Sequence, residues 1–259
     1  MPLSSSLQAS IRRFLKKKIL AKVDAYSLDE EDASKPFQYA LFTKKGYLVK
    51  GFIHGCETAL GNWHEHIAKI IAEANFSIAK KLQGKERLHG VVTIKADSAI
   101  SEILSGLDSA THQPNYEKEK ATIMRVGRIG RTVKRVQTVD LFLVTKTGQE
   151  IYVEIKGPKP NKNEMRAAKR DLLEILAMRA AKQKNVHAFL GMYYNPYAPQ
   201  EYQRWTCLKF FDPGEDFLIG KSFWDFLGGR GAYEDLIHIY ETVGEEIRPV
   251  LEKKLKSLR

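Results

Sequence analysis

The chain has 259 residues, of which 43% are hydrophobic, and its 42 Lys and Arg against 31 Asp and Glu give a formal net charge of +11 at pH 7. Two cysteines, Cys56 and Cys207, exclude a disulfide scaffold and a zinc site made from Cys-x-x-Cys pairs, and they are most simply free thiols in a reducing cytosol. No apolar run is long enough to span a bilayer. The basic excess favours a polyanionic partner, because Lys and Arg that neutralise phosphates release the counterions bound there.

The N-terminal residues predict helices with a β-rich segment between them. Four apolar side chains near the start fall on one helical stripe: Leu7, Ile11, Leu15 and Ile19. The same stretch is rich in Ser, Arg and Lys and superficially resembles a mitochondrial transit peptide, but an ordinary amphipathic helix explains it. Residues 37–53 are aromatic and β-branched and predict a hairpin or two short strands, whereas residues 58–82 have the helical period.

A basic segment follows a predicted strand at 88–96 and a predicted helix at 97–108. Residues 118–135 hold seven basic residues against one acid, Glu119. The basic residues Arg125, Arg128, Arg131 and Lys134 recur at every third position, and Arg135 follows. A flexible loop that is bare of acids from Arg125 onward could follow a DNA phosphate backbone, so these five are candidate DNA-binding residues; a solvated basic loop is the alternative.

The most informative stretch is a predicted β-hairpin over residues 139–156, in which two β-rich runs are separated by a polar turn around Gly148. Because side chains alternate along a strand, Glu154 and Lys156 share one face. Antiparallel pairing can bring Asp140, at the start of the partner strand, close to Glu154. We therefore expect two carboxylates and an ammonium in one small patch.

Such a patch can hold Mg²⁺, which prefers carboxylates, water and phosphate oxygens. Asp140 and Glu154 are the candidate ligands, and the Ile155 carbonyl is a further one. The ion can activate a water and neutralise charge that develops on a phosphodiester, and Lys156 could orient that water or stabilise the transition state. The alternative is an exposed hairpin whose outward face simply carries charge.

Beyond the hairpin, helix and strand patterns alternate. A rigid turn precedes a predicted helix over 164–184, for which Asn163 is the candidate cap. A strand at 186–194 would pair in parallel with the hairpin, with that helix as the crossover. Residues 204–211 predict another strand, and residues 233–258 an amphipathic helix.

Five basic residues crowd this turn and the first turns of the following helix: Lys159, Lys162, Arg166, Lys169 and Arg170. A helix N-terminus favours acids, so the cluster is misplaced for stability. A polyanion at the rim of the site would explain it, and solvated surface charge is the alternative.

The spacing Asp140-x13-Glu154-x-Lys156 resembles the active site of the PD-(D/E)xK nuclease superfamily, with Val139 in place of the usual proline. Further segments look like type II restriction endonucleases of the TdeIII group: EIKGPKPNK at 154–162, KRDLL at 169–173, YNPY at 194–197 and GKSFWDFLGG at 220–229. The similarity covers residues 120–245 best. It implies an α/β fold with a mixed central β-sheet flanked by helices.

The resemblance also implies an activity, namely Mg²⁺-dependent cleavage of double-stranded DNA by a homodimer at a short palindrome, GG-N-CC-like, with a DNA methyltransferase protecting the host. Many such nucleases carry an acid on the helix before the core sheet, and Glu65 is the candidate for it. We expect one nuclease domain over residues 1–259, with a catalytic core at about 55–212 and helical N- and C-terminal elements. Two alternatives stay open: a repair or junction-resolving nuclease of the same superfamily, and a non-catalytic DNA-binding module.

Overall fold

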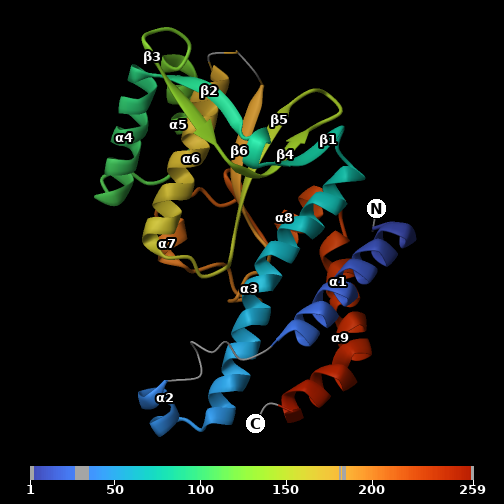
Figure 1. The fold of residues 1–259 in the computed structure, drawn as a ribbon. Coiled ribbons are helices and arrows are strands. Elements are labelled where there is room, and N and C mark those ends of the chain that lie inside the picture. Colours follow the sequence, from blue (N-terminus) through green and yellow to red (C-terminus); the bar gives the residue numbers. More distant parts are fainter. Residues whose placement is uncertain (1–2, 27–34, 181, 183–184, 258–259) are drawn as a thin grey trace. The chain divides into compact units, whose positions relative to one another are not determined.

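The computed structural model describes residues 3–26, 35–180, 182 and 185–257. It divides into two compact units (Figure 1). Residues Met1–Ile67 with Gly231–Arg259 form one, called here the helical unit, and Ala68–Arg230 form the other, the sheet unit. The expectation of one nuclease domain stays a prediction, and each unit is described by itself.

The helical unit contains α1 (Ser5–Ala25), α2 (Pro36–Leu41), most of α3 (Lys44–Glu73) and α9 (Ala232–Ser257). The predicted first helix is confirmed, because its apolar stripe buries Ile11 and Leu15. α1 packs against α9, and the Leu3 backbone N–H donates to Asp235 Oδ2 at 2.7 Å. The amphipathic pattern of α1 therefore serves an ordinary helix–helix contact.

The prediction of strands over residues 37–53 is wrong, because these residues form α2 and the start of α3. Pro36 stands in the first turn of α2, where its fixed φ suits a helix and its missing N–H removes no helical bond. Along α3, Leu48 and Phe52 are four residues apart and both buried. The helical period of buried side chains thus outweighs the local preference of aromatic and β-branched residues for strands.

The sheet unit is built on a five-stranded sheet in the order β1-β4-β5-β6-β7. The strands are β1 (Ile78–Leu82), β4 (Val139–Val144), β5 (Glu150–Lys156), β6 (Val186–Met192) and β7 (Phe217–Ile219). β1, β4 and β5 pair antiparallel, whereas β5, β6 and β7 pair parallel. The predicted mixed central sheet is confirmed; β1 occupies the end of the stretch predicted as helix over 58–82.

Helices and a second, smaller sheet surround these strands. They are α4 (Ile94–Asp108), α5 (Tyr116–Val126), α6 (Lys162–Ala180), α7 (Trp205–Leu208), α8 (Lys221–Gly228), the 3-10 helix η2 (Gly84–Glu86), and the antiparallel pair β2 (Leu88–Thr93) and β3 (Thr132–Gln137). α4, α5 and α6 pack against one another, and α6 also contacts β5 and β6 (Figure 1). In the described part of the chain, no helix is long and apolar enough to cross a membrane.

The predicted hairpin is confirmed as β4 and β5, with Leu141 opposite Val153. Its turn closes through the Thr145 N–H on the Gln149 carbonyl at 3.0 Å and the Gly148 N–H on the Thr145 carbonyl at 2.9 Å. Gly148 has φ 84°, a left-handed conformation that glycine adopts without a Cβ clash. The glycine therefore fixes where β5 starts, and with it the register of the hairpin.

As predicted, α6 is the crossover between β5 and β6, although it begins at Lys162. Its cap is Asn161 and not Asn163: Asn161 Oδ1 accepts from the Glu164 N–H at 2.9 Å, and Glu164 Oε2 accepts from the Asn161 N–H at 2.8 Å. This reciprocal pair is a capping box. It fixes the start of the helix directly after the turn that leaves β5.

Two further expectations are wrong. Residues 118–135, predicted as a loop, form most of α5 and β3, and residues 204–211, predicted as a strand, contain α7. The Asn115 side chain caps α5, and Tyr116 and Ile123 are buried on its inner side. Most basic residues between 118 and 135 thus lie on a helix and a strand that the core holds in place, and Arg128 and Arg131 lie in the short loop between them.

Candidate active site

The β4–β5 hairpin brings Asp140 and Glu154 to neighbouring positions. Leu141 lies opposite Val153, so continuing the register places Asp140 opposite Glu154, and directly opposed side chains extend from the same face of a sheet. Lys156 follows two residues later on β5 and shares that face. The three predicted catalytic side chains therefore lie together.

Two contacts tie this cluster together. Lys156 Nζ lies 2.5 Å from Glu154 Oε1, and the backbone N–H of Ile155 donates to Asp140 Oδ2 at 2.9 Å. The Glu154 side chain is 16% exposed and that of Lys156 is 33% exposed. The carboxylate is therefore largely shielded from water, while the ammonium remains within reach of a ligand.

The electrostatics of Glu154 reflect its crowded setting. Its pKa is raised to about 7, first by burial and next by the Asp140 carboxylate, while the Lys156 ammonium lowers it. Removing two like charges from water while holding them close disfavours the state in which both are ionised. A bound cation would relieve this repulsion.

The donor set fits Mg²⁺ better than a softer metal. Mg²⁺ is commonly held by one or two carboxylates and keeps several waters, and Asp140, Glu154 and the Ile155 carbonyl offer oxygen donors. Among the residues that the structure describes, no group of three or more His, Cys, Asp or Glu is arranged to hold a metal ion. A site here would thus depend on two carboxylates, a backbone carbonyl and water, and the Mg²⁺ site stays a prediction.

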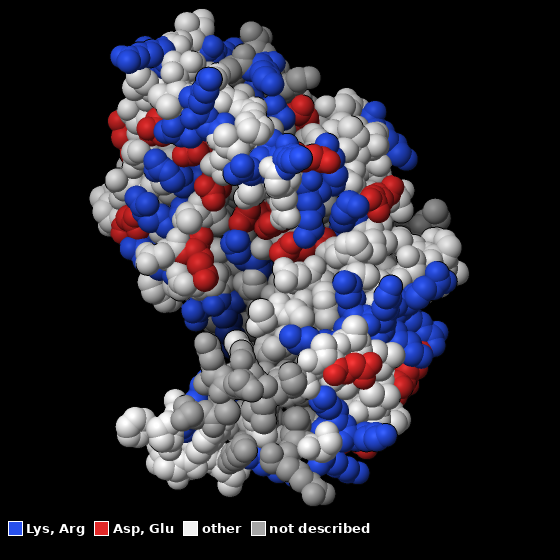
Figure 2. All heavy atoms as spheres, in the orientation of Figure 1, with Lys and Arg blue, Asp and Glu red and all other residues white. Residues whose placement is uncertain are grey.

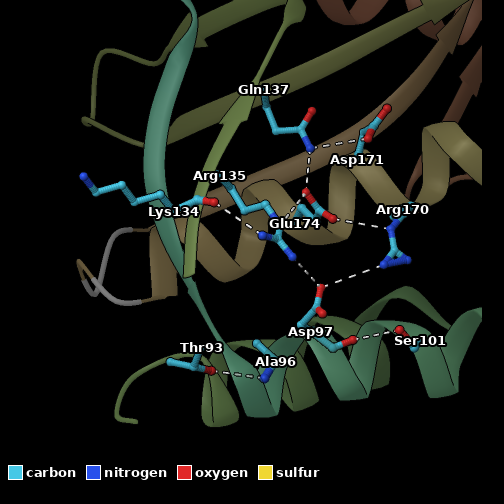
Figure 3. A network of polar contacts seen from close by, with 10 residues as sticks. All are labelled: Thr93, Ala96, Asp97, Ser101, Lys134, Arg135, Gln137, Arg170, Asp171 and Glu174. Carbon is cyan, nitrogen blue, oxygen red and sulfur yellow. Dashed lines mark hydrogen bonds and ion pairs between the residues drawn. The ribbon is translucent and has the colours of Figure 1, made fainter. Parts of the chain in front are cut away.

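A third carboxylate, Asp171 on α6, belongs to the same environment and was not among the residues predicted from the sequence. Its charge raises the pKa of Glu154, and the Lys156 ammonium in turn lowers the pKa of Asp171. Gln137 on β3 donates to it (Figure 3). The sequence signal for Asp171 is its place in the KRDLL segment, directly after Lys169 and Arg170.

Several predicted DNA-binding residues are exposed. Arg125 on α5, Arg128 and Arg131 in the following loop, Lys134 on β3, and Lys159 after β5 all present their side chains to solvent. The face of the sheet unit visible in Figure 2 carries Lys and Arg interspersed with Asp and Glu. These five side chains can reach a phosphate from solvent, and their contact with DNA stays a prediction.

Four other predicted DNA-binding residues already have acidic partners. Lys162 and Arg166 both contact Asp108, and Lys162 Nζ lies 2.8 Å from Asp108 Oδ1. Together the two cations lower the pKa of the Asp108 carboxyl. Arg135 and Arg170 take part in the polar network of Figure 3. A phosphate would have to compete with these carboxylates.

The prediction of DNA contact is wrong for Lys169. Its side chain is 1% exposed, and its Nζ lies 2.5 Å from both Glu119 Oε2 and Asp216 Oδ2. The ring of Phe211 lies 5.2 Å away. An ammonium enclosed in this way neutralises two buried acids and cannot reach a DNA backbone.

Glu65 lies on α3 in the helical unit, whereas Asp140, Glu154 and Lys156 lie in the sheet unit. Its predicted role as an acid near the metal therefore stays a prediction. Within the sheet unit, Asp171 is the acid that shares the electrostatic environment of the cluster.

Known proteins resemble this chain over most of its length. The family model described as "Type II restriction endonuclease, HinfI" matches residues 3–244. The type II restriction enzyme HgiEI of Herpetosiphon aurantiacus is 28% identical over 242 residues, which cover 92% of this chain and 88% of that enzyme. HgiBI of the same organism is 28% identical over 247 residues, which cover 93% of this chain and 87% of that enzyme. The type II restriction enzyme MjaII of Methanocaldococcus jannaschii is 28% identical over 195 residues, which cover 69% of this chain and 50% of that enzyme.

Proposed function

The chain belongs to the HinfI family of type II restriction endonucleases, and from that premise we propose that it hydrolyses double-stranded DNA at a short palindrome with Mg²⁺ as its cofactor. The family confirms the expected site-specific endonuclease, whereas the finer resemblance to the TdeIII group stays a prediction. The observation that carries the proposal is the placement of Asp140, Glu154 and Lys156 on one face of the β4–β5 hairpin.

In this proposal Asp140 and Glu154 bind the metal, with the Ile155 carbonyl as a further ligand. When bound, Mg²⁺ supplies charge neutralisation at the phosphodiester and lowers the pKa of a water. Lys156 donates a hydrogen bond to the attacking water or to a phosphate oxygen, because its ammonium shares a face with both carboxylates. Glu65 is proposed as an assisting acid.

The exposed basic residues are proposed to hold the DNA backbone: Arg125, Arg128, Arg131, Lys134 and Lys159. Phosphate contacts of this kind position a duplex without reading its sequence. Arg135, Lys162, Arg166 and Arg170 are proposed as weaker contacts, since each is already paired with a carboxylate.

A palindrome suits a homodimer, because two-fold symmetry gives each strand its own active site. We propose that two copies of this chain read a GG-N-CC-like sequence, and that they do so in the cytoplasm. A DNA methyltransferase of the same system would protect the host sites, without forming a stable complex with the nuclease.

Digestion of plasmid DNA by the purified protein, with and without Mg²⁺, tests the proposal when the fragment ends are sequenced. Discrete fragments that share a palindromic end sequence are expected, and only with Mg²⁺. Preference for branched over plain duplex would point instead to a repair or junction-resolving nuclease. Tight DNA binding without Mg²⁺-dependent cleavage would indicate a non-catalytic DNA-binding module.

A further inference from the structure

Asp171 is held in place by a carboxamide from another element. Gln137 Nε2 on β3 donates to Glu174 Oε2 at 2.7 Å and, over a longer distance of 3.4 Å, to Asp171 Oδ1. Asp171 and Glu174 are three residues apart on α6, so they share one side of the helix. Gln137 thereby bridges two acids that repel each other.

Two guanidinium groups complete this network (Figure 3). Arg135 lies 3.2 Å from Asp97 Oδ1 and 3.9 Å from Glu174 Oε2. Arg170 lies 3.4 Å from Glu174 Oε1 and 3.8 Å from Asp97 Oδ1. The arginine contacts with acids drawn in Figure 3 therefore end on Asp97 and Glu174, while Asp171 is reached through Gln137.

Asp171 is also coupled to the candidate active site. Burial and the Glu174 charge raise the pKa of Asp171, whereas the Lys156 ammonium lowers it, and the Asp171 charge contributes to the raised pKa of Glu154. Geometry places Asp171 on the same side: its partner Gln137 lies three residues before Asp140 in the chain, and Asp140 Oδ2 accepts from the Ile155 N–H at 2.9 Å. Asp171 lies on the crossover helix that packs against β5, the strand that carries Glu154 and Lys156.

The ion pair between Lys156 and Glu154 would weaken when Glu154 binds a metal ion. Lys156 Nζ lies 2.5 Å from Glu154 Oε1, and a carboxylate that shares its charge with a metal ion attracts an ammonium less strongly. A lysine side chain is long and flexible, so its ammonium needs another anion to remain beside the site once Glu154 is engaged.

We propose that Asp171 is the positioning residue for Lys156, receiving its ammonium when Glu154 binds metal and keeping it on the face where the phosphodiester is cut. This role rests on the proposed function, because it assumes metal binding at Glu154. Gln137 holds the Asp171 carboxylate in place, and the arginines are engaged by Asp97 and Glu174. The Asp171 carboxylate thereby remains an oxygen acceptor that Lys156 can use.

The test compares Asp171→Asn, which keeps the side-chain shape and an acceptor for Gln137, with Asp171→Glu and Asp97→Asn. Asp97 is the other aspartate of the network, and its described partners are Arg135 and Arg170. Single-turnover cleavage by Asp171→Asn should fall by about 10- to 100-fold, as for other residues that orient catalytic groups. Asp171→Glu should recover part of the rate, and Asp97→Asn should stay near the wild type.

A second measurement does not depend on cleavage. Each protein, without DNA, is treated with an amine-acylating reagent with and without Mg²⁺, and labelling of Lys156 relative to exposed Lys159 is measured by peptide mass spectrometry. With Mg²⁺, Lys156 should be labelled several-fold faster in Asp171→Asn than in the wild type, whereas without Mg²⁺ the two should agree. Equal melting temperatures would show that all variants are folded.

The proposal is overturned if Asp171→Asn cuts at the wild-type rate, if Asp97→Asn loses as much activity, or if Lys156 labelling with Mg²⁺ is the same in both proteins. Failure of the proposed function would be seen separately, as a wild-type protein that does not cut duplex DNA with Mg²⁺.

Discussion

Burial decides what a single charged side chain does in this protein. Lys159 and Lys169 come from the same basic cluster of the sequence, yet Lys159 is exposed and Lys169 is 1% exposed between Glu119 and Asp216. The alternation of side chains along strands was enough to predict that Glu154 and Lys156 share a face. Nothing local could predict the partners of Lys169, because Glu119 and Asp216 lie about 50 residues away on either side.

Lys169→Met should destabilise the fold strongly, because it leaves two buried carboxylates without their cation. Breaking a buried ion pair in this way costs about 3–5 kcal/mol, to be measured by urea unfolding at pH 8. The variant should recover part of the loss as the pH falls towards 5. Its buried acids would then bind protons in the folded state more readily than in the unfolded state, and stability rises on acidification when the folded state binds more protons.

Lys159→Met is the matched control, since an exposed substitution usually changes stability by less than about 0.5 kcal/mol. Equal free energies of unfolding for the two variants would contradict the account of Lys169.

At the scale of elements, segments with strong local signals were predictable. Gly148 marked the hairpin turn, and the run of apolar residues at 186–192 marked β6 after a helical crossover. The segments whose predicted secondary structure is wrong are those where tertiary packing outweighs the local preference of the residues. Residues 37–53 prefer strands locally, but Leu48 and Phe52 are buried at helical spacing, and residues 132–137 become a strand by pairing with β2.

The loop between α5 and β3 is the element whose DNA contact is most directly testable. Arg128 and Arg131 flank Ile129, which is 86% exposed, and Gly130, whose φ is 141°. The double variant Arg128→Ala/Arg131→Ala should weaken DNA binding. It should also flatten the dependence of log K on log salt by about 0.9 for each phosphate that these side chains neutralise in the wild type.

Binding titrations at several salt concentrations measure this slope, and an unchanged slope would exclude the loop from the DNA interface. Cleavage at saturating DNA should change little, because the loop residues are proposed to position the duplex and not to react.

At the scale of the whole molecule, the match to the family model covers residues 3–244 and so includes residues of both compact units. It contains α1 and the start of α9 up to residue 244, together with the sheet. The hairpin supplies one cluster of Asp140, Glu154 and Lys156 per chain. A symmetric cut in both strands would then need two chains, as proposed above.

The most direct measurement of the central claim is single-turnover cleavage of a duplex with Mg²⁺ by Asp140→Asn and Lys156→Met, together with their affinity for the same DNA. Both variants should cut about 10²- to 10³-fold more slowly than the wild type, because each removes a group that acts on the reacting phosphate, while their DNA affinity stays within about tenfold. Cleavage at the wild-type rate by either variant would contradict the assignment of this cluster as the active site.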